Sequence, residues 1–393
     1  MIKIPDTSIP AEQVAHLLNE WYLTIQKFSI AKSKKLQKKA QNMLEKMSPN
    51  QDVLLYYSLL DFRCQLNYEK PQQLKKVHRK IEKLVDDHEH LNALLTYYYD
   101  FFNGLYEFKR RNLIRSLHFY RKAVEEVNRL DDEIERGQCY YRLSQVYFKL
   151  SYSVISILYA NMAIKIFDRH QDYYISNIYS RVLVANNLIH DQCFTHALSI
   201  FTDANKLAIE KQNSQLIAIT SFNIGIAQIH LKTYKEAEQN FYRAMICFRE
   251  IKDRYEPRAI CSYYESLLMQ KKYKQAAVIY GKGIESAKSW HNDEYQAKIN
   301  LLKAIYQDEF DQERIDASIS KLMVMDLYEY VLSLTISVAE RCRERRMDKQ
   351  AIKYYELSNE IRNHITEGAG INEKVFNKDD LSVINNYIST VGC

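Results

Sequence analysis

The chain has 393 residues, enough to bury a large core, and only 8 of them are Gly and 5 are Pro. So few helix breakers, among abundant Leu, Ile, Ala, Lys and Glu, indicate a nearly all-helical protein. The net charge of +6, from 55 basic and 49 acidic residues, is too small to predict nucleic-acid binding by itself.

The sequence shows no sign of export, of a disulfide framework or of a zinc site. Residues 1–13 lack the basic and apolar regions of a signal peptide, and no run approaches the roughly 18 apolar residues of a membrane span. The seven cysteines are scattered and never form a CxxC pair. We therefore expect a soluble, cytoplasmic protein with reduced thiols and no membrane contact.

Apolar residues at helical spacing predict three helices before residue 70. The first two follow stripes separated by a break near Ser29: Val14, Leu17, Leu18, Trp21, Ile25 and Phe28, then Leu36, Ala40, Met43, Leu44 and Met47. We expect the third helix to start at Pro49, with Ser48 as its N-cap and Asp52 favouring the helix dipole. Residues 1–70 are thus predicted to form a three-helix bundle, which ends in polar residues around Pro71.

The third helix is apolar on two sides, and Gln51 stands at its start. The two stripes are Val53, Tyr57, Leu60 and Cys64, and Leu55, Leu59, Phe62 and Leu66. In one interpretation Gln51 belongs to a capping box and accepts the Ser48 backbone N–H. In another, the second stripe is an exposed docking strip for another protein, with Gln51 at its polar tip. The competing interpretation is that the second stripe packs against the rest of the chain.

A repeat of helix pairs follows the bundle. The repeated pattern has an aromatic residue, a small residue three positions later, a second aromatic residue at seven positions and a second small residue at ten. It occurs three times: Phe194, Ala197, Phe201, Ala204; Tyr234, Ala237, Phe241, Ala244; and Tyr273, Ala276, Tyr280, Gly283. Weaker copies begin at Leu113. The spacing puts all four positions on one helical face, where small residues let the next helix approach closely.

This pattern is similar to the tetratricopeptide repeat, with a period longer than that family's roughly 34 residues. We predict an α-solenoid over residues 71–365, whose concave surface suits an extended peptide or a partner helix, and a C-terminal tail over residues 366–393. The fold class is therefore all-α: an N-terminal three-helix bundle followed by a tetratricopeptide-repeat-like solenoid. The repeat residues themselves are interpreted as scaffold.

Several stretches in order resemble the Rap family of Bacillus regulators, which includes response regulator aspartate phosphatases and proteins that sequester response regulators. They are LNEWY (18–22), NQDVLLYYSLLDFR (50–63), YYYDFFNGLYEF (97–108), DDEIE (131–135), YANMAIKIF (159–167) and FNIGIAQIHLKTYKEA (222–237). The resemblance implies that the bundle and early repeats bind the receiver domain of a response regulator of the sporulation phosphorelay type. It also implies that Gln51, in the QD-L-L-Y-Y motif, is the catalytic residue and enters the receiver's acidic pocket.

A glutamine suits this role, because a carboxamide donates and accepts hydrogen bonds without a charge that would repel the phosphoryl group. It can hold a water in line with the aspartyl-phosphate bond. The resemblance implies no cofactor of the chain's own, because the response regulator carries the Mg²⁺. The residues expected to contact the receiver are Leu55, Phe62, Leu94, Asp132 and Tyr173. Asp132 can equally be an ordinary acidic start of a helix.

Two other functions stay open. A Rap-type protein can sequester the DNA-binding domain of a response regulator without catalysis, as in competence control. A peptide-responsive transcription factor would need a recognition helix, and residues 10–66 show no short helix rich in Ser, Arg, Gln and Asn, so we expect no direct contact with nucleic acid.

Family members are commonly inhibited by a short Phr pentapeptide bound inside the repeats. Asn187 and Asn223 match positions whose side chains would clamp the peptide backbone, although each can equally make a local hydrogen bond within the solenoid. Relatives carry an acidic residue in a V-A-x-N-L-I-D segment, where this chain has His190 in VANNLIHD. The resemblance therefore predicts that His190 alters or abolishes peptide control.

The stretch AKSKKLQKKA is rich in lysine. Its five lysines are Lys32, Lys34, Lys35, Lys38 and Lys39. We interpret them as the solvated face of the second helix, where they can also attract an acidic receiver over long range. The alternative is a patch that follows a phosphate backbone.

Overall fold

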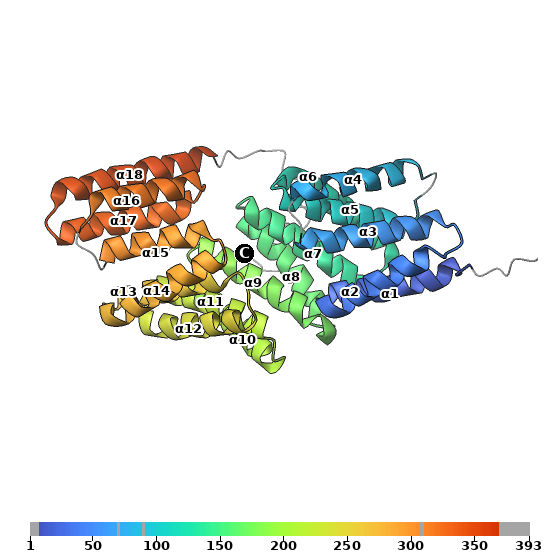
Figure 1. The fold of residues 1–393 in the computed structure, drawn as a ribbon, viewed down its shortest axis with the longest axis horizontal. Coiled ribbons are helices and arrows are strands. Elements are labelled where there is room, and N and C mark those ends of the chain that lie inside the picture. The colour runs from blue at the N-terminus through green and yellow to red at the C-terminus, as the bar shows by residue number, and fades with distance from the viewer. Residues whose placement is uncertain (1–7, 69–70, 89–90, 307–309, 369–393) are drawn as a thin grey trace, which may run out of the picture. The chain divides into compact units, whose positions relative to one another are not determined.

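A computed structural model describes residues 8–68, 71–88, 91–306 and 310–368 of the chain (Figure 1). These residues form eighteen α-helices and one 3₁₀ turn, and the described part contains no strand beyond an isolated bridge between Ile9 and Met47. None of the helices in these ranges is long and apolar enough to cross a membrane. The predicted all-α fold class is confirmed.

The chain divides into two compact units, with the division between Asp191 and Gln192. The helices of the first unit are α1 (Ala11–Gln26), α2 (Ile30–Leu44), α3 (Gln51–Tyr68), α4 (Pro71–Asp86), α5 (Ala93–Lys109), α6 (Leu113–Leu130), α7 (Glu133–Lys149), α8 (Ser153–Phe167), the 3₁₀ turn η1 (Gln171–Tyr173) and α9 (Tyr174–His190). Helices α1 to α3 are the predicted bundle elements. They belong to the same unit as α5 to α9, so the boundary at residue 70 stays a prediction.

The second unit continues the series of helix pairs. Its helices are α10 (Phe194–Glu210), α11 (Ser214–His230), α12 (Tyr234–Glu250), α13 (Glu256–Met269), α14 (Tyr273–Ser289), α15 (Asp293–Tyr306), α16 (Gln312–Val324), α17 (Tyr328–Glu344) and α18 (Asp348–Gly368). The tail predicted over residues 366–393 begins within α18, and from residue 369 it lies outside the described residues.

The turns within several helix pairs contain a residue in the left-handed region. Equivalent turns have positive φ at Arg111, Ser151, Gln192, Lys232 and Lys271, which repeats the period of about 40 residues seen in the alanine and aromatic pattern. None of these residues is a glycine, so the turn is set by the packing of the two helices rather than by the freedom of one residue.

The small residues of the predicted repeat lie in the cores of the helix pairs, whereas Tyr273, the first position of one copy, is 37% exposed. Ala197, Phe201 and Ala204 are fully buried, as are Ala237 and Ala244. Glycines mark the closest helix contacts, because a Cβ on Gly225 would lie 2.6 Å from a Phe241 ring carbon and one on Gly104 would lie 2.5 Å from Tyr120. The same close contact between a glycine and an aromatic ring thus occurs in both units. This shows that the weak copy beginning at Leu113 is a true repeat.

Candidate functional site

Gln51 is the first residue of α3 and is held there by its neighbours. Asn50 caps the helix: its Oδ1 accepts the Val53 N–H at 3.0 Å and its carbonyl oxygen accepts the Leu54 N–H at 3.2 Å. Just before the cap, the backbone pairs with the start of the chain, since Ile9 N donates to the Lys46 carbonyl at 2.8 Å. The position of Gln51 is therefore fixed by the backbone on both sides.

The predicted capping box is wrong. The Ser48 N–H donates to the Ile9 carbonyl oxygen at 3.1 Å and is not available to Gln51. The helix also starts two residues later than expected, because Asn50 and not Ser48 is the cap. Among the described residues the exposed Gln51 side chain has no hydrogen-bond partner, so its carboxamide is free to act on another molecule.

Helices α3 and α5 run side by side in the same direction (Figure 1). At their starts, Asp52 accepts hydrogen bonds from His88 Nε2 at 2.8 Å and Asn92 Nδ2 at 3.3 Å. Further along, the rings of Tyr56 and Tyr98 stack with centroids 5.3 Å apart. Asn92 is itself the N-cap of α5 and accepts the Leu95 N–H at 3.0 Å. The N-termini of the two helices are thereby joined.

Helices α7 and α9 begin on the same side of the first unit as α3 and α5. Tyr97, near the start of α5, donates to Glu135 near the start of α7 at 2.5 Å. Gln138 of α7 donates to Ser176 in the first turn of α9 at 2.9 Å. We call the side on which these helices begin the N-terminal edge. It carries four of the predicted site residues: Gln51, Leu94, Asp132 and Tyr173.

The apolar surface beside Gln51 differs from the predicted strip. Leu55 is 2% exposed and Phe62 is 1% exposed, so the expectation that they form an exposed strip is wrong for this structure. The competing interpretation, internal packing, is correct. Leu54, which sequence analysis did not single out, is 42% exposed and lies one turn from Gln51, and Leu94 is 39% exposed. The accessible apolar side chains at this end of α3 and α5 are therefore Leu54 and Leu94.

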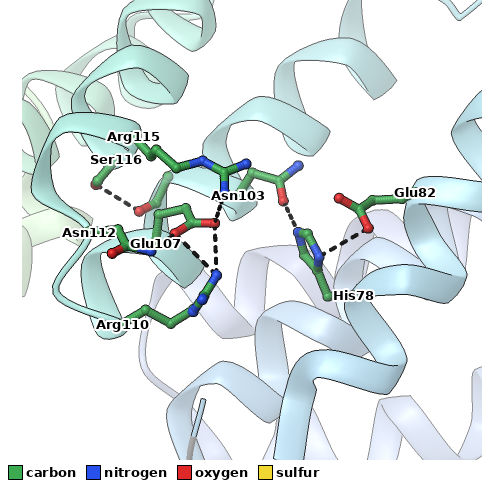
Figure 2. Close-up of polar contacts among 9 residues, drawn as sticks. His78, Glu82, Asn103, Glu107, Arg110, Asn112, Arg115 and Ser116 are labelled. Atoms are coloured by element: carbon green, nitrogen blue, oxygen red, sulfur yellow. Dashed lines mark hydrogen bonds and ion pairs between the residues drawn. The ribbon is translucent and has the colours of Figure 1, made fainter. Parts of the chain in front are cut away.

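Helices α4 and α5 cover Phe62. Its ring lies 5.7 Å from the His78 ring and 5.6 Å from the Tyr106 ring. The His78 ring stacks on the Tyr106 ring with centroids 4.4 Å apart. Its Nε2 is 2.5 Å from Asn103 Oδ1, and Figure 2 draws this contact as a dashed line. Its Nδ1 lies 3.5 Å from a Glu82 oxygen. These contacts hold α4 against α5 and keep Phe62 out of reach of a partner in this conformation.

The same figure shows how the turn after α5 is fixed. The carboxylate of Glu107, which is 1% exposed, accepts hydrogen bonds from Asn112 Nδ2 at 2.7 Å and from Arg110 at 3.3 Å, and a guanidinium nitrogen of Arg115 lies 3.6 Å away (Figure 2). Ser116 Oγ donates to the Gly104 carbonyl oxygen at 2.8 Å. A buried carboxylate with several donors indicates a structural role, and it sits on the opposite end of α5 from Leu94.

Asp132 and Tyr173 both have partners inside the chain. Asp132 is the exposed N-cap of α7 and accepts the Glu135 N–H at 3.0 Å, so its role as a helix start is confirmed. Tyr173 is half-buried, its hydroxyl donates to Gln26 Oε1 at 3.4 Å, and burial raises its pKa. Contact of either residue with a receiver stays a prediction.

Sequence analysis missed Glu135, the fourth acidic residue of DDEIE. Its side chain is 3% exposed and accepts hydrogen bonds from Tyr22 Oη at 3.0 Å, Gln26 Nε2 at 2.7 Å and Tyr97 Oη at 2.5 Å. Burial raises the pKa of this carboxyl to about 7, against the lowering effect of the tyrosine hydrogen bonds. Glu135 thus connects α1 with α5 and α7 beneath the N-terminal edge.

The predicted peptide-binding residues lie in different surroundings. Asn187 is fully buried and donates to Ser156 Oγ at 2.9 Å and to the Leu183 carbonyl at 2.8 Å, so the local role is correct and the clamp role is wrong for this conformation. His190 is exposed, with Nδ1 3.4 Å from Asp191. In the second unit the half-buried Asn223 donates to the Ile219 carbonyl at 2.9 Å. Peptide contacts of His190 and Asn223 stay predictions.

Within the described ranges, no group of three or more His, Cys, Asp or Glu side chains could hold a metal ion.

Comparison with known proteins gives matches along nearly the whole chain. Residues 8–69 match the family model described as response regulator aspartate phosphatase H, N terminal. The chain is 30% identical over 369 residues to response regulator aspartate phosphatase I of Bacillus subtilis (strain 168), with 93% of this chain and 94% of that protein covered. It is 28% identical to regulatory protein RapF of the same organism, with 93% and 98% covered. The crystal structure of a Rap protein complexed with competence and sporulation factor has a TM-score of 0.76 and 29% identity, with 91% of this chain and 99% of that chain covered.

Proposed function

Since the chain is 30% identical to a response regulator aspartate phosphatase along 94% of that relative, it belongs to the Rap family, and we propose that it hydrolyses the aspartyl phosphate of a response regulator. The relatives' names make response regulators the partners of this family, and one solved relative holds a competence and sporulation factor. We therefore assign this chain a response regulator as partner and control by a Phr-type peptide.

The observation that carries the proposal is the free carboxamide of Gln51 at the start of α3. The N-terminus of a helix presents unpaired N–H groups and the positive end of the helix dipole, which favours an approaching phosphoryl group. Gln51 accepts a hydrogen bond from a water and aims its oxygen at phosphorus. The water adds to phosphorus, the bond to the aspartate oxygen breaks, and the aspartate leaves as a carboxylate.

In this proposal the metal belongs to the partner. A Mg²⁺ held by the receiver would neutralise charge on the phosphoryl oxygens, and the chain supplies the amide that orients the water. The exposed Leu54, one turn along α3 from Gln51, and the exposed Leu94, in the first turn of α5, exclude solvent where the receiver docks. Asp132 and Tyr173 extend the docking surface along the N-terminal edge.

Replacing Gln51 with Ala tests the proposal. We expect Gln51→Ala to slow phosphate loss from a phosphorylated sporulation-type regulator by about 100-fold or more, because the water loses its orienting group. Binding of the regulator should stay within about threefold, since Leu54 and Leu94 are untouched. Gln275→Ala removes another exposed glutamine, from α14, and serves as the matched control. Equal loss of activity in both variants would remove Gln51 from the mechanism.

Sequestration without catalysis is the second candidate, because RapF, at 28% identity, is named a regulatory protein. Here the chain would cover the DNA-binding domain of a regulator whether or not the regulator is phosphorylated. A gel-shift competition with a regulator whose phosphorylatable aspartate is replaced by alanine separates the two. Release of DNA from that regulator supports sequestration, and retention of DNA supports the phosphatase.

A further inference from the structure

The first unit contains a small cavity whose lining comes mainly from α1, α3, α5 and α7. Its volume is about 20 Å³, which holds one or two water-sized groups. Four lining side chains are apolar or aromatic and four are polar: Tyr22, Ile25, Phe28 and Phe101, and Gln26, Arg63, Gln138 and Arg142. These eight residues carry two positive charges and no negative one. The cavity is therefore a cationic site with apolar walls.

Arg142 has few partners for its charge. Its Nη1 donates to Gln145 Oε1 at 2.8 Å, and the guanidinium carbon lies 5.2 Å from the centroid of the Tyr141 ring. Within the described part of the chain Arg142 makes no ion pair, and its Nε–H is buried without a hydrogen-bond acceptor. A buried donor without an acceptor costs free energy, so this guanidinium favours an anion that supplies acceptors.

Arg63 adds a second positive charge at the same cavity. Burial lowers the pKa of its guanidinium, and the like charge of Arg142 lowers that pKa further. Arg63 is held by contacts of its own within the chain, so it acts on the cavity through its charge. An anion beside both arginines would offset their mutual repulsion.

The buried carboxyl of Glu135 does not supply this anion. Its oxygens accept hydrogen bonds from Tyr22 at 3.0 Å, Gln26 at 2.7 Å and Tyr97 at 2.5 Å. Among the described residues it forms no ion pair with Arg142. The positive charge of Arg142 thus has no carboxylate partner from this part of the chain.

The size and the lining of the cavity indicate which anion fits. A carboxylate presents two oxygens in one plane, and a guanidinium binds them through two parallel N–H groups. Two oxygens fit a cavity of about 20 Å³, whereas the four oxygens of a phosphate need more room. Phe28 lines the cavity and is 45% exposed, so the cavity borders the surface there and a short aliphatic chain can extend past it.

We propose that this cavity binds a small aliphatic carboxylate, whose oxygens pair with Arg142 and whose chain lies against Ile25 and Phe28. Because the lining comes from several helices, the bound carboxylate stabilises the packing of α1 and α3 against α5 and α7. The site is separate from Gln51, so the inference does not depend on the proposed hydrolysis.

The first test uses the parent chain alone, with butyrate as the probe. Titration calorimetry at constant ionic strength should give a dissociation constant of about 1 mM or tighter. The neutral butyramide has the same shape without the charge, and we expect it to bind at least about tenfold more weakly. Inorganic phosphate should also bind more weakly than butyrate, because it is too large for the cavity.

The second test compares two variants of the full chain. Arg142→Gln removes the guanidinium from the cavity, and Arg129→Gln makes the same change of net charge at an exposed arginine of α6, which pairs with Glu126 at 2.9 Å. Circular dichroism checks that both variants fold. We expect Arg142→Gln to weaken butyrate binding by about tenfold or more. Arg129→Gln should stay within about twofold of the parent chain.

Equal butyrate affinity of the parent chain and folded Arg142→Gln would overturn the inference. So would tighter binding of butyramide or phosphate than of butyrate. A parent chain that shows no butyrate binding up to about 10 mM would overturn it without any variant.

Discussion

The Asn50 side chain sets the position of Gln51. Its Oδ1 accepts the Val53 N–H at 3.0 Å, and without this bond the first turn of α3 would fray at the residue that carries the carboxamide. We expect Asn50→Ala to lower the unfolding free energy by about 1 kcal/mol and to slow phosphate loss. Asn50→Asp keeps a capping oxygen and should retain both properties. Urea unfolding and phosphate release measure the two effects, and a fully active Asn50→Ala would contradict the role of the cap.

Glu135 makes the first unit sensitive to pH. Its pKa is about 7 in the folded chain and 4.5 for an ordinary glutamate, so its contribution to stability is fully present below pH 4.5 and is lost as the pH rises through 7. The shift corresponds to about 3 kcal/mol. We expect Glu135→Gln to remove this dependence, so that the variant gains about 3 kcal/mol relative to the parent between pH 4.5 and 8.

The measurement is urea unfolding at a series of pH values. The chain has 2 Trp, and in a Trp290→Phe background the buried Trp21 alone reports on the first unit. Glu133→Gln, two residues away, is the control, because the His170 hydrogen bond lowers the pKa of Glu133 and its effect has the opposite sign. The same pH dependence in both variants would show that the burial of Glu135 is not the cause.

Helix pairs of the repeat depend on small residues at the closest contact. A Cβ at Gly225 would lie 2.6 Å from Phe241, which is 1% exposed and cannot move away. We expect Gly225→Ala to cost about 1 to 3 kcal/mol of stability. Gly281, on α14, has nothing within 4 Å of such a Cβ, so Gly281→Ala should raise stability by up to about 1 kcal/mol. Thermal unfolding measures the change in stability of both variants. Unchanged stability of Gly225→Ala would contradict the close packing against Phe241.

The helix pattern could be predicted because it depends on local spacing. Alternating small and aromatic residues predicted the buried faces of α10 and α12, and Ala197, Phe201 and Ala204 are indeed fully buried. The start of α3 could not be predicted to the residue, since Ser48 and Asn50 are equally good caps. The choice was decided by Ile9, far away in sequence, which takes the Ser48 N–H.

Contacts between helices that are distant in sequence explain why the other predictions differ from the structure. Periodicity placed Phe62 on a stripe, but it could not show that His78 and Tyr106 cover that stripe. Likewise the acidic run DDEIE gave no sign that Glu135 is buried, because its hydrogen-bond donors Tyr22 and Tyr97 come from two other helices. Leu54 was missed for the same reason, since exposure depends on what packs against a helix.

At the scale of the whole molecule, the first unit carries the residues that the proposed function assigns to receiver binding and hydrolysis. Gln51 is exposed at the start of α3, and the exposed Leu54 and Leu94 lie in the first turns of α3 and α5. These residues come from two helices whose starts are joined by the hydrogen bond between Asn92 and Asp52, so the site is a product of the fold rather than of one motif. The second unit continues the helix pairs and carries Asn223, one of the two peptide contacts that stay predictions.

The central claim is that Gln51 directs water onto the aspartyl phosphate of a bound regulator. Single-turnover phosphate loss from the complex, with the chain in saturating excess, measures this step without interference from binding. The account predicts that the parent chain accelerates the loss and that the Gln51→Ala complex decays at the rate of the regulator alone. Equal acceleration by both chains would contradict it.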